Sequence, residues 1–168
     1  QQQIVDAAIA VFADKGYHQA KISDITDRAG VAKGTFYLYF KSKNDLFATL
    51  LNEFMDLIFI SFFIPGAEKI ASPRDIRDRF DRVTHLALMM LRMNRDLARI
   101  FLLEGGAWDP SFEKTVRQFY RELAAGAAAN LRAWMDKGLL RPADPDAIAL
   151  CVIGMIERLA MQWTAGIP

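Results

Sequence analysis

Apolar residues recur at intervals of three and four along the whole chain, which is the spacing of one face of an α-helix. In the first such segment, Ile4, Ala8, Val11 and Phe12 share a face, and the segment stops at Gly16. No stretch alternates apolar and polar residues in the way a half-buried strand does, and no internal repeat is present. The pattern therefore predicts an all-α chain of about eight helices.

Glycines, prolines and capping residues divide this periodic pattern into separate helices. After the first, the predicted helices are 22–29, 33–40, a long one that starts at 42 and ends before 65, one from 73 to 93, 95–104, one from 109 to 138, and 146–163. Ser42 is expected to accept the backbone N–H of Asp45, whose carboxylate reaches back to form a capping box. The helix from 73 has two apolar stripes, so we expect it to run through the middle of its domain.

Length and composition indicate a globular protein. The chain has 168 residues, of which 52% are hydrophobic, and this apolar content excludes disorder as the main state. The single cysteine, Cys151, excludes both an intrachain disulfide framework and a two-cysteine zinc motif. The longest apolar runs, 57–64 and 147–156, are shorter than the ~20 residues of a membrane span. We therefore expect a cytoplasmic protein with no membrane partner.

Positive charge is concentrated in one stretch of the chain. Between Asp27 and Asp45 there is no acidic residue, and the basic ones are Arg28, Lys33, Lys41 and Lys43. This local charge of +4 lies within a chain whose total is +1. Two short helices joined at Gly30, with basic and hydroxyl-bearing side chains, have the layout of a helix-turn-helix DNA reader. On charge alone, a solvated lysine-rich surface is an equal alternative.

The ordered phrase around this stretch is more specific than its charge. It consists of Gly16-Tyr17, then Ile22-Ser23-Asp24-Ile25, then residues 29–46, AGVAKGTFYLYFKSKNDL. This phrase, with its spacing over residues 4–51, resembles the DNA-binding domain of the tetracycline-repressor (TetR) family. The resemblance implies a three-helix helix-turn-helix DNA-binding domain at 1–46. It also implies a larger helical domain for ligand binding and dimerisation at 47–168.

The resemblance implies DNA contacts residue by residue. The implied contacts to base edges and phosphates are Lys21, Ser23, Lys33, Gly34, Thr35, Tyr37, Tyr39 and Lys43. Gly34 is expected to let the backbone approach DNA closely, and Lys43 to bind phosphate at a helix N-terminus. The chain departs from the family at Lys21, Ala32 and Thr26. Ala32 stands where a serine commonly caps the recognition helix, and losing such a cap typically costs about 1 kcal/mol.

In this family the larger domain binds a small molecule. The aromatic, methionine and histidine side chains expected to line its cavity are Phe59, Phe62, Phe63, His85, Met89, Met93, Phe101, Trp108, Phe119 and Tyr120. A lining with so few charges favours a hydrophobic or aromatic effector, such as an acyl compound or a drug-like toxin. Each of these residues could instead belong to an ordinary core. Glu104 and Arg158 are further polar candidates, with solvated charge as the plainer interpretation.

The last two predicted helices are the expected interface of a homodimer. Residues 147–156 are apolar on nearly every side, and 124–129 have small side chains that allow close helix approach. The alternative is that both helices are buried within a monomer. A symmetric dimer is expected to bind a palindromic DNA operator, as a repressor that the effector releases.

Two other classes of protein remain open on the sequence. One is a dimeric DNA-binding regulator without a ligand, and the other is a helical-bundle enzyme. The chain has only two histidines and one cysteine, far apart in sequence, and no glycine-rich phosphate loop or metal-spaced cluster. We therefore expect no cofactor, no metal and no catalytic site.

Overall fold

A computed structural model describes residues 1–63, 66–103 and 110–164 of the chain. Over these ranges it contains eight α-helices, one short 3-10 helix and no strand, which confirms the all-α prediction. In chain order the elements are α1 (Gln2–Lys15), α2 (Ile22–Ala29), α3 (Lys33–Tyr39), α4 (Lys43–Phe62), η1 (Ala67–Lys69), α5 (Pro73–Met93), α6 (Arg95–Leu103), α7 (Pro110–Asp136) and α8 (Pro145–Thr164).

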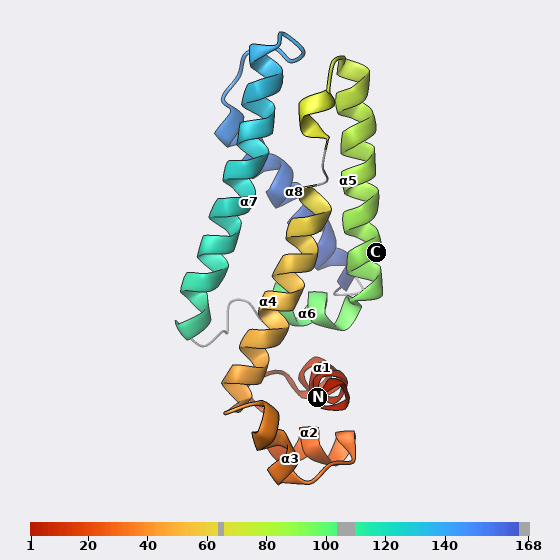
Figure 1. Ribbon diagram of the computed structural model, residues 1–168, viewed down its shortest axis with the longest axis vertical. Coiled ribbons are helices and arrows are strands. Elements are labelled where there is room, and N and C mark those ends of the chain that lie inside the picture. The colour runs from red at the N-terminus through yellow and green to blue at the C-terminus, as the bar shows by residue number, and fades with distance from the viewer. Residues whose placement is uncertain (64–65, 104–109, 165–168) are drawn as a thin grey trace.

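The molecule is elongated, with α1, α2 and α3 at one end and the longer helices filling the rest (Figure 1). We call helices α1–α3 the head and helices α5–α8 the bundle. Helix α4 runs from the head into the bundle (Figure 1) and packs against α1, α5, α6 and α7. The sequence boundary expected at residues 46 and 47 therefore falls inside a continuous helix.

Helix ends lie close to the positions predicted from glycine and capping residues. Gly16 and Gly30 follow α1 and α2 with φ angles of 76° and 65°, a region that side chains with a Cβ rarely adopt. Ser42 accepts the Asp45 N–H at 3.0 Å, as predicted. The Asp45 carboxylate does not reach back to Ser42 but accepts the Lys41 N–H at 2.8 Å, which corrects that half of the capping box.

Helix α2, the first helix of the motif, has Lys21 at its N-cap in place of a serine or threonine, and a carboxylate caps it instead of a hydroxyl. Asp24 accepts the backbone N–H of Lys21 at 2.9 Å and pairs with Lys15 at 3.0 Å. The backbone hydrogen bond from Lys21, followed by that from the Lys15 side chain, lowers the pKa of the Asp24 carboxyl. The departure at Lys21 therefore leaves the N-terminus of α2 with a carboxylate cap.

Aromatic rings join the head to the bundle. Phe47 of α4 lies with its ring centroid 5.6 Å from Phe12 of α1 and 4.4 Å from Tyr17 of the following turn. On its other side it lies 5.1 Å from Phe112 of α7. All four rings are buried. The head is thus packed against the bundle through the first turns of α4.

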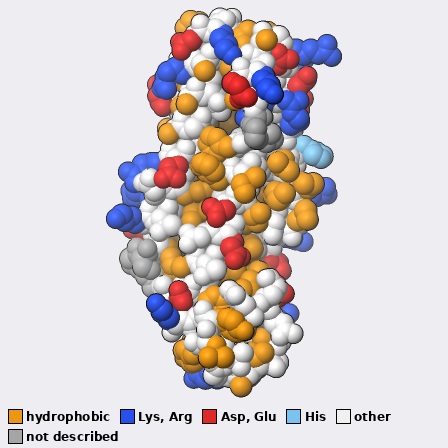
Figure 2. Space-filling view, viewed as in Figure 1, with side chains coloured by type: hydrophobic (Ala, Val, Ile, Leu, Met, Phe, Trp, Pro, Cys, Tyr) orange, Lys and Arg blue, Asp and Glu red, His pale blue; other side chains and the backbone are white. Residues whose placement is uncertain are grey.

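Helix α5 does not run through the middle of the molecule, contrary to the prediction from its two apolar stripes. Its buried residues are only Arg79, Ala87 and Leu91, and its exposed apolar ones are Phe80, Leu88, Met89 and Met93. Apolar side chains gather at mid-height on the side where α5 is drawn (Figure 2). The central position is taken by α4, which leaves α5 packed on one side only.

By length and composition, the segment that holds α4 and helix α8 could each cross a membrane, with mean hydropathies of 1.7 and 1.3. The sequence had predicted no membrane-spanning segment, because its longest apolar runs are short. In α4 the apolar face that includes Leu46, Leu50 and Phe54 is buried against other helices, as in the core helix of a globular protein.

Replacing Phe47 with alanine is expected to lower the free energy of unfolding by about 3–5 kcal/mol, because the change removes a buried ring that three other rings surround. Urea unfolding followed by circular dichroism measures this loss. Leu38→Ala is the control, since that side chain is 79% exposed and its loss should change stability by less than about 0.5 kcal/mol. Equal effects of the two changes would contradict the ring cluster's role.

Candidate nucleic-acid interface and bundle cavities

Helix α3 is held by one face and exposes the other. Phe36 and Phe40 are buried and anchor it to the head, while the turn before it is closed by the Val31 N–H bonded to the Thr26 carbonyl at 3.0 Å. Lys33, Gly34 and Tyr37 lie on the exposed face. This arrangement of two short helices around a left-handed glycine is that of a helix-turn-helix.

Most residues predicted to contact DNA are accessible at this end of the molecule. The exposed ones are Lys21, Ser23, Lys33, Gly34, Tyr37 and Tyr39. Thr35 is half-buried, and its N–H bonds to the Ala32 carbonyl at 2.8 Å. A Cβ added to Gly34 would meet no atom within 4 Å. Nothing inside the chain requires a glycine there, although glycine within a helix costs about 1 kcal/mol.

Leu38 is a surface residue that the sequence reasoning missed. Its side chain is 79% exposed, more than that of the neighbouring Tyr37. An apolar side chain in such a position can contact the methyl group of thymine in a major groove. The available signal was its position in the helix, two residues from both Phe36 and Phe40 and therefore off their buried face.

The structure gives Lys43 partners other than the predicted phosphate. Its ammonium group donates to the backbone carbonyls of Tyr17 at 2.6 Å, Ala20 at 2.8 Å and His18 at 3.3 Å. The same Nζ lies 4.4 Å from the centre of the Tyr17 ring. Partial burial lowers the pKa of this lysine. An ammonium has three N–H donors, so these carbonyls occupy all of them and tie α4 to the turn after α1.

Two adjoining cavities within the bundle share part of their walls. The larger, about 420 Å³, lies between α4, α5, α7 and α8, and the smaller, about 50 Å³, lies deeper against α6. Of the predicted lining residues, Phe63 faces the larger cavity and Phe62 faces both. The predicted residues that face the smaller one are Phe101, Phe119 and Tyr120.

Four other predicted lining residues do not face either cavity. Phe59, His85, Met89 and Met93 are exposed and absent from both walls, so the structure does not bring them together with the other predicted lining residues. The physical reason is helical position, since α5 turns the face of Ile76 and Val83 toward the larger cavity. Trp108 and Glu104 lie outside the described residues, and Arg158 is exposed on α8.

Polar groups in the cavity walls escaped the sequence reasoning. Arg79 is only 5% exposed and lines the larger cavity together with Asn130 and Arg141. Burial, followed by the nearby charge of Arg82, lowers the pKa of the Arg79 guanidinium. The available signal was a charged residue within the apolar stripe of α5, between Ile76 and Val83.

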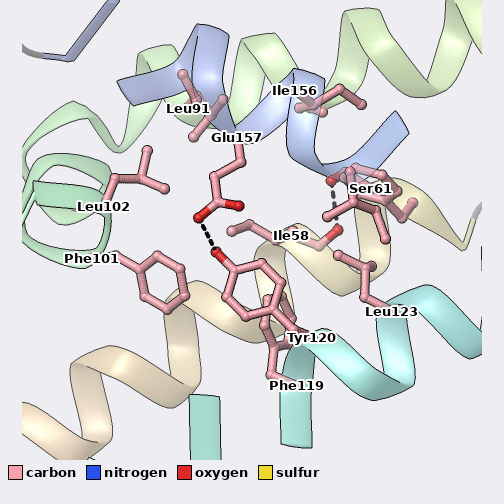
Figure 3. A pocket seen from close by; sticks show the side chains of 14 residues that line it. Ile58, Ser61, Leu91, Phe101, Leu102, Phe119, Tyr120, Leu123, Ile156 and Glu157 are labelled. Carbon is pink, nitrogen blue, oxygen red and sulfur yellow. Dashed lines mark hydrogen bonds between the residues drawn. The ribbon is translucent and has the colours of Figure 1, made fainter. Parts of the chain in front are cut away.

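The smaller cavity contains a hydrogen-bonded pair of ionisable side chains. The Tyr120 hydroxyl of α7 donates to the Glu157 carboxylate of α8 at 2.9 Å, surrounded by apolar side chains (Figure 3). Burial, followed by the charge of Glu157, raises the pKa of the Tyr120 hydroxyl well above its ordinary value. Tyr120 therefore remains a neutral donor. Glu157 could have been singled out as an acidic residue in the apolar segment of α8.

One small residue of the alanine-rich segment has a specific use inside the chain. A Cβ on Gly126 of α7 would overlap the ring of Phe63, which follows α4. The sequence reasoning assigned the small side chains of 124–129 to a partner's helix. At this position the missing side chain instead admits a ring that lines the larger cavity.

Comparison with known proteins supports both the helix-turn-helix and the all-α fold described above. Residues 4–50 match the model of the bacterial regulatory proteins of the tetR family. The chain is 55% identical over 102 residues to the fatty acid metabolism regulator protein of Bacillus subtilis (strain 168). That alignment covers 61% of this chain and 50% of the relative, so it spans about half the relative's length.

Two further matches extend over almost the whole chain. The HTH-type transcriptional regulator YdgC of Bacillus subtilis is 29% identical over 160 residues, covering 94% of this chain and 77% of that protein. The crystal structure of FadR from Bacillus subtilis in complex with stearoyl-CoA superposes with a TM-score of 0.77 at 26% identity, covering 98% of this chain and 87% of that one. Residues 4–50 thus carry the DNA-binding domain of the bacterial regulatory proteins of the tetR family, and almost the whole chain has the fold of such regulators.

Proposed function

We propose that this protein is a dimeric, cytoplasmic repressor that binds a palindromic operator and is released by a fatty acyl thioester of coenzyme A. The observation that carries the DNA-binding part is the exposed face of α3. Lys33 supplies charge there and Tyr37 supplies a hydroxyl. Gly34 leaves the backbone uncovered, and no contact inside the chain requires a glycine at that position. Such a face suits close approach to a major groove.

The dimer is supported by the exposed apolar side chains of α8. Leu150, Met155, Leu159 and Trp163 are large apolar residues of this helix that the chain leaves exposed. Gly154 is exposed on the same helix, and a Cβ added to it meets nothing within 4 Å, so a second helix can approach closely there. The monomer alternative requires these side chains to be buried within the chain, and they are not. A second copy of α7 and α8 would cover them in a four-helix bundle.

The effector class is supported by the larger cavity. Its volume of about 420 Å³ lies in the range of small-molecule sites, about 300–1,000 Å³. Its walls are mostly apolar, and Arg79 and Arg141 add positive charge. Such a cavity fits an alkyl chain with an anionic head. The similar FadR structure contains stearoyl-CoA, and another relative regulates fatty acid metabolism, which favours an acyl thioester over an aromatic drug.

Helix α4 is the proposed route from effector to DNA. Phe62 at its C-terminal end lines both cavities, and Lys43 at its N-terminal end holds the head. An effector that binds one tilt of α4 more tightly shifts the population toward that tilt and changes the spacing of the two heads. A regulator without a ligand would not need such a cavity. The relatives are regulators, which favours this class over an enzyme.

Replacing Lys43 with glutamine is expected to lower the free energy of unfolding by about 1 kcal/mol, because three carbonyls, two of them in partly buried hydrogen bonds, lose a charged donor. The salt dependence of DNA binding should not change. Lys33→Gln is the matched control, and it should keep stability but reduce the salt slope by about 0.9 for each subunit. If Lys43→Gln reduces the slope and leaves stability unchanged, Lys43 contacts phosphate after all.

Replacing Leu159 with glutamate is expected to convert the dimer into monomers and to weaken operator binding, because two linked heads bind more tightly than one. Sedimentation equilibrium measures the association. The control is Leu88→Glu, since Leu88 of α5 is 48% exposed and Leu159 63%. If Leu88→Glu dissociates the dimer while Leu159→Glu remains dimeric, the dimer interface lies on α5 and not on α8.

Palmitoyl-CoA is expected to weaken binding to the operator, with the operator first obtained by selecting bound sequences from random DNA. The selected sequence should be a palindrome, and fluorescence anisotropy then measures the affinity with and without the thioester. Free coenzyme A is the control and should have no effect, because it lacks the alkyl chain. If palmitoyl-CoA binds but leaves DNA affinity unchanged, the proposed release is wrong.

A further inference from the structure

The two cavities of the bundle are separated by a wall only one side chain thick. Three residues line both of them: Phe62 at the end of α4, and Ile153 and Ile156 of α8. On one side of this wall is the volume of about 420 Å³, and on the other the volume of about 50 Å³. Both volumes have mainly apolar linings, so one alkyl chain could occupy them in succession.

Phe62 is the movable part of this wall. Ile153 and Ile156 lie in the interior of α8, and as β-branched side chains they have stiff χ1 angles in a helix. Phe62 is the last residue of α4 and is half-buried. Rotation of its ring therefore disturbs the fewest helix contacts of the three and joins the two cavities.

The smaller cavity is lined by residues of α6 as well as of α4, α5, α7 and α8. Phe101, Leu102 and Phe119 line it, and the hydrogen bond between Tyr120 and Glu157 crosses it at 2.9 Å (Figure 3). Its volume compares with about two water molecules at ~30 Å³ each, so only the end of a chain fits. An alkyl tail that arrives there meets α6, which packs against α1 of the head.

We propose that the Phe62 ring is a chain-length gate between the two cavities, an inference that rests on the acyl ligand of the proposed function. A short acyl chain fills the larger cavity and leaves the ring where it is. A long chain displaces the ring, enters the smaller cavity and reaches the walls formed by Phe101 and Leu102. Only the long chain then contacts both α4 and α6, the two bundle-side helices that pack against α1.

The test compares the dissociation constants of palmitoyl-CoA and octanoyl-CoA by isothermal titration calorimetry. Phe62→Ala removes the gate and should increase the preference for palmitoyl-CoA at least about tenfold, since each additional buried methylene contributes about a fourfold gain. Phe62→Trp enlarges the gate and should decrease that preference by a similar factor. Ile60→Ala removes a side chain of the same helix that is 67% exposed and lines neither cavity, and it should leave the preference unchanged.

The possible outcomes separate this proposal from the function on which it rests. Opposite shifts in the alanine and tryptophan variants support the gate. If the unchanged protein binds palmitoyl-CoA and all variants keep its preference, the gate is wrong while the acyl ligand stands. If the folded, unchanged protein binds neither thioester, the proposed effector class is wrong and the gate falls with it. Thermal unfolding of each variant establishes that it is folded before the titrations.

Discussion

Helix α4 is the constraint on which the rest of the structure depends. Its buried side chains, including Leu46, Leu50 and Phe54, occupy the centre of the molecule, and it packs against helices of both the head and the bundle. At one end the Lys43 ammonium group donates to backbone carbonyls in the turn that follows α1. At the other end Phe62 forms a wall of both cavities. The proposed DNA-binding surface and the proposed effector cavity thus lie at the two ends of one element.

This arrangement explains how a small change in the bundle can reach the head. The 20 residues of α4 span about 30 Å at 1.5 Å per residue, so a slight tilt at the cavity becomes a larger displacement at α3. The Phe47 ring cluster and the Lys43 contacts make the head follow α4 rather than absorb its motion. A flexible connection at the same position would lose this coupling. The proposed release of DNA therefore requires the continuity of α4 as much as it requires the cavity.

The sequence predicted the parts of this structure that depend on local chemistry. Helix ends followed from Gly16 and Ser42 because left-handed glycines and hydroxyl caps act within a few residues. Side-chain partners far away in sequence did not follow. Lys43 bonds carbonyls that precede it by 23 to 26 positions, and a basic residue beside a DNA-binding motif gives no sign of that. Likewise, the apolar stripes of α5 show that side chains are apolar but not which helix takes the centre.

The central claim is that an acyl ligand in the bundle changes the separation of the two heads through α4. The most direct measurement is the distance between spin labels on Cys substituted for Asp14 of α1 in each subunit, an exposed residue outside the predicted DNA contacts, with Cys151 replaced by serine. Pulsed electron resonance would record the distance distribution with and without saturating palmitoyl-CoA. The account predicts that the ligand moves the distribution away from the one observed on operator DNA. An identical distribution with the ligand demonstrably bound would contradict it.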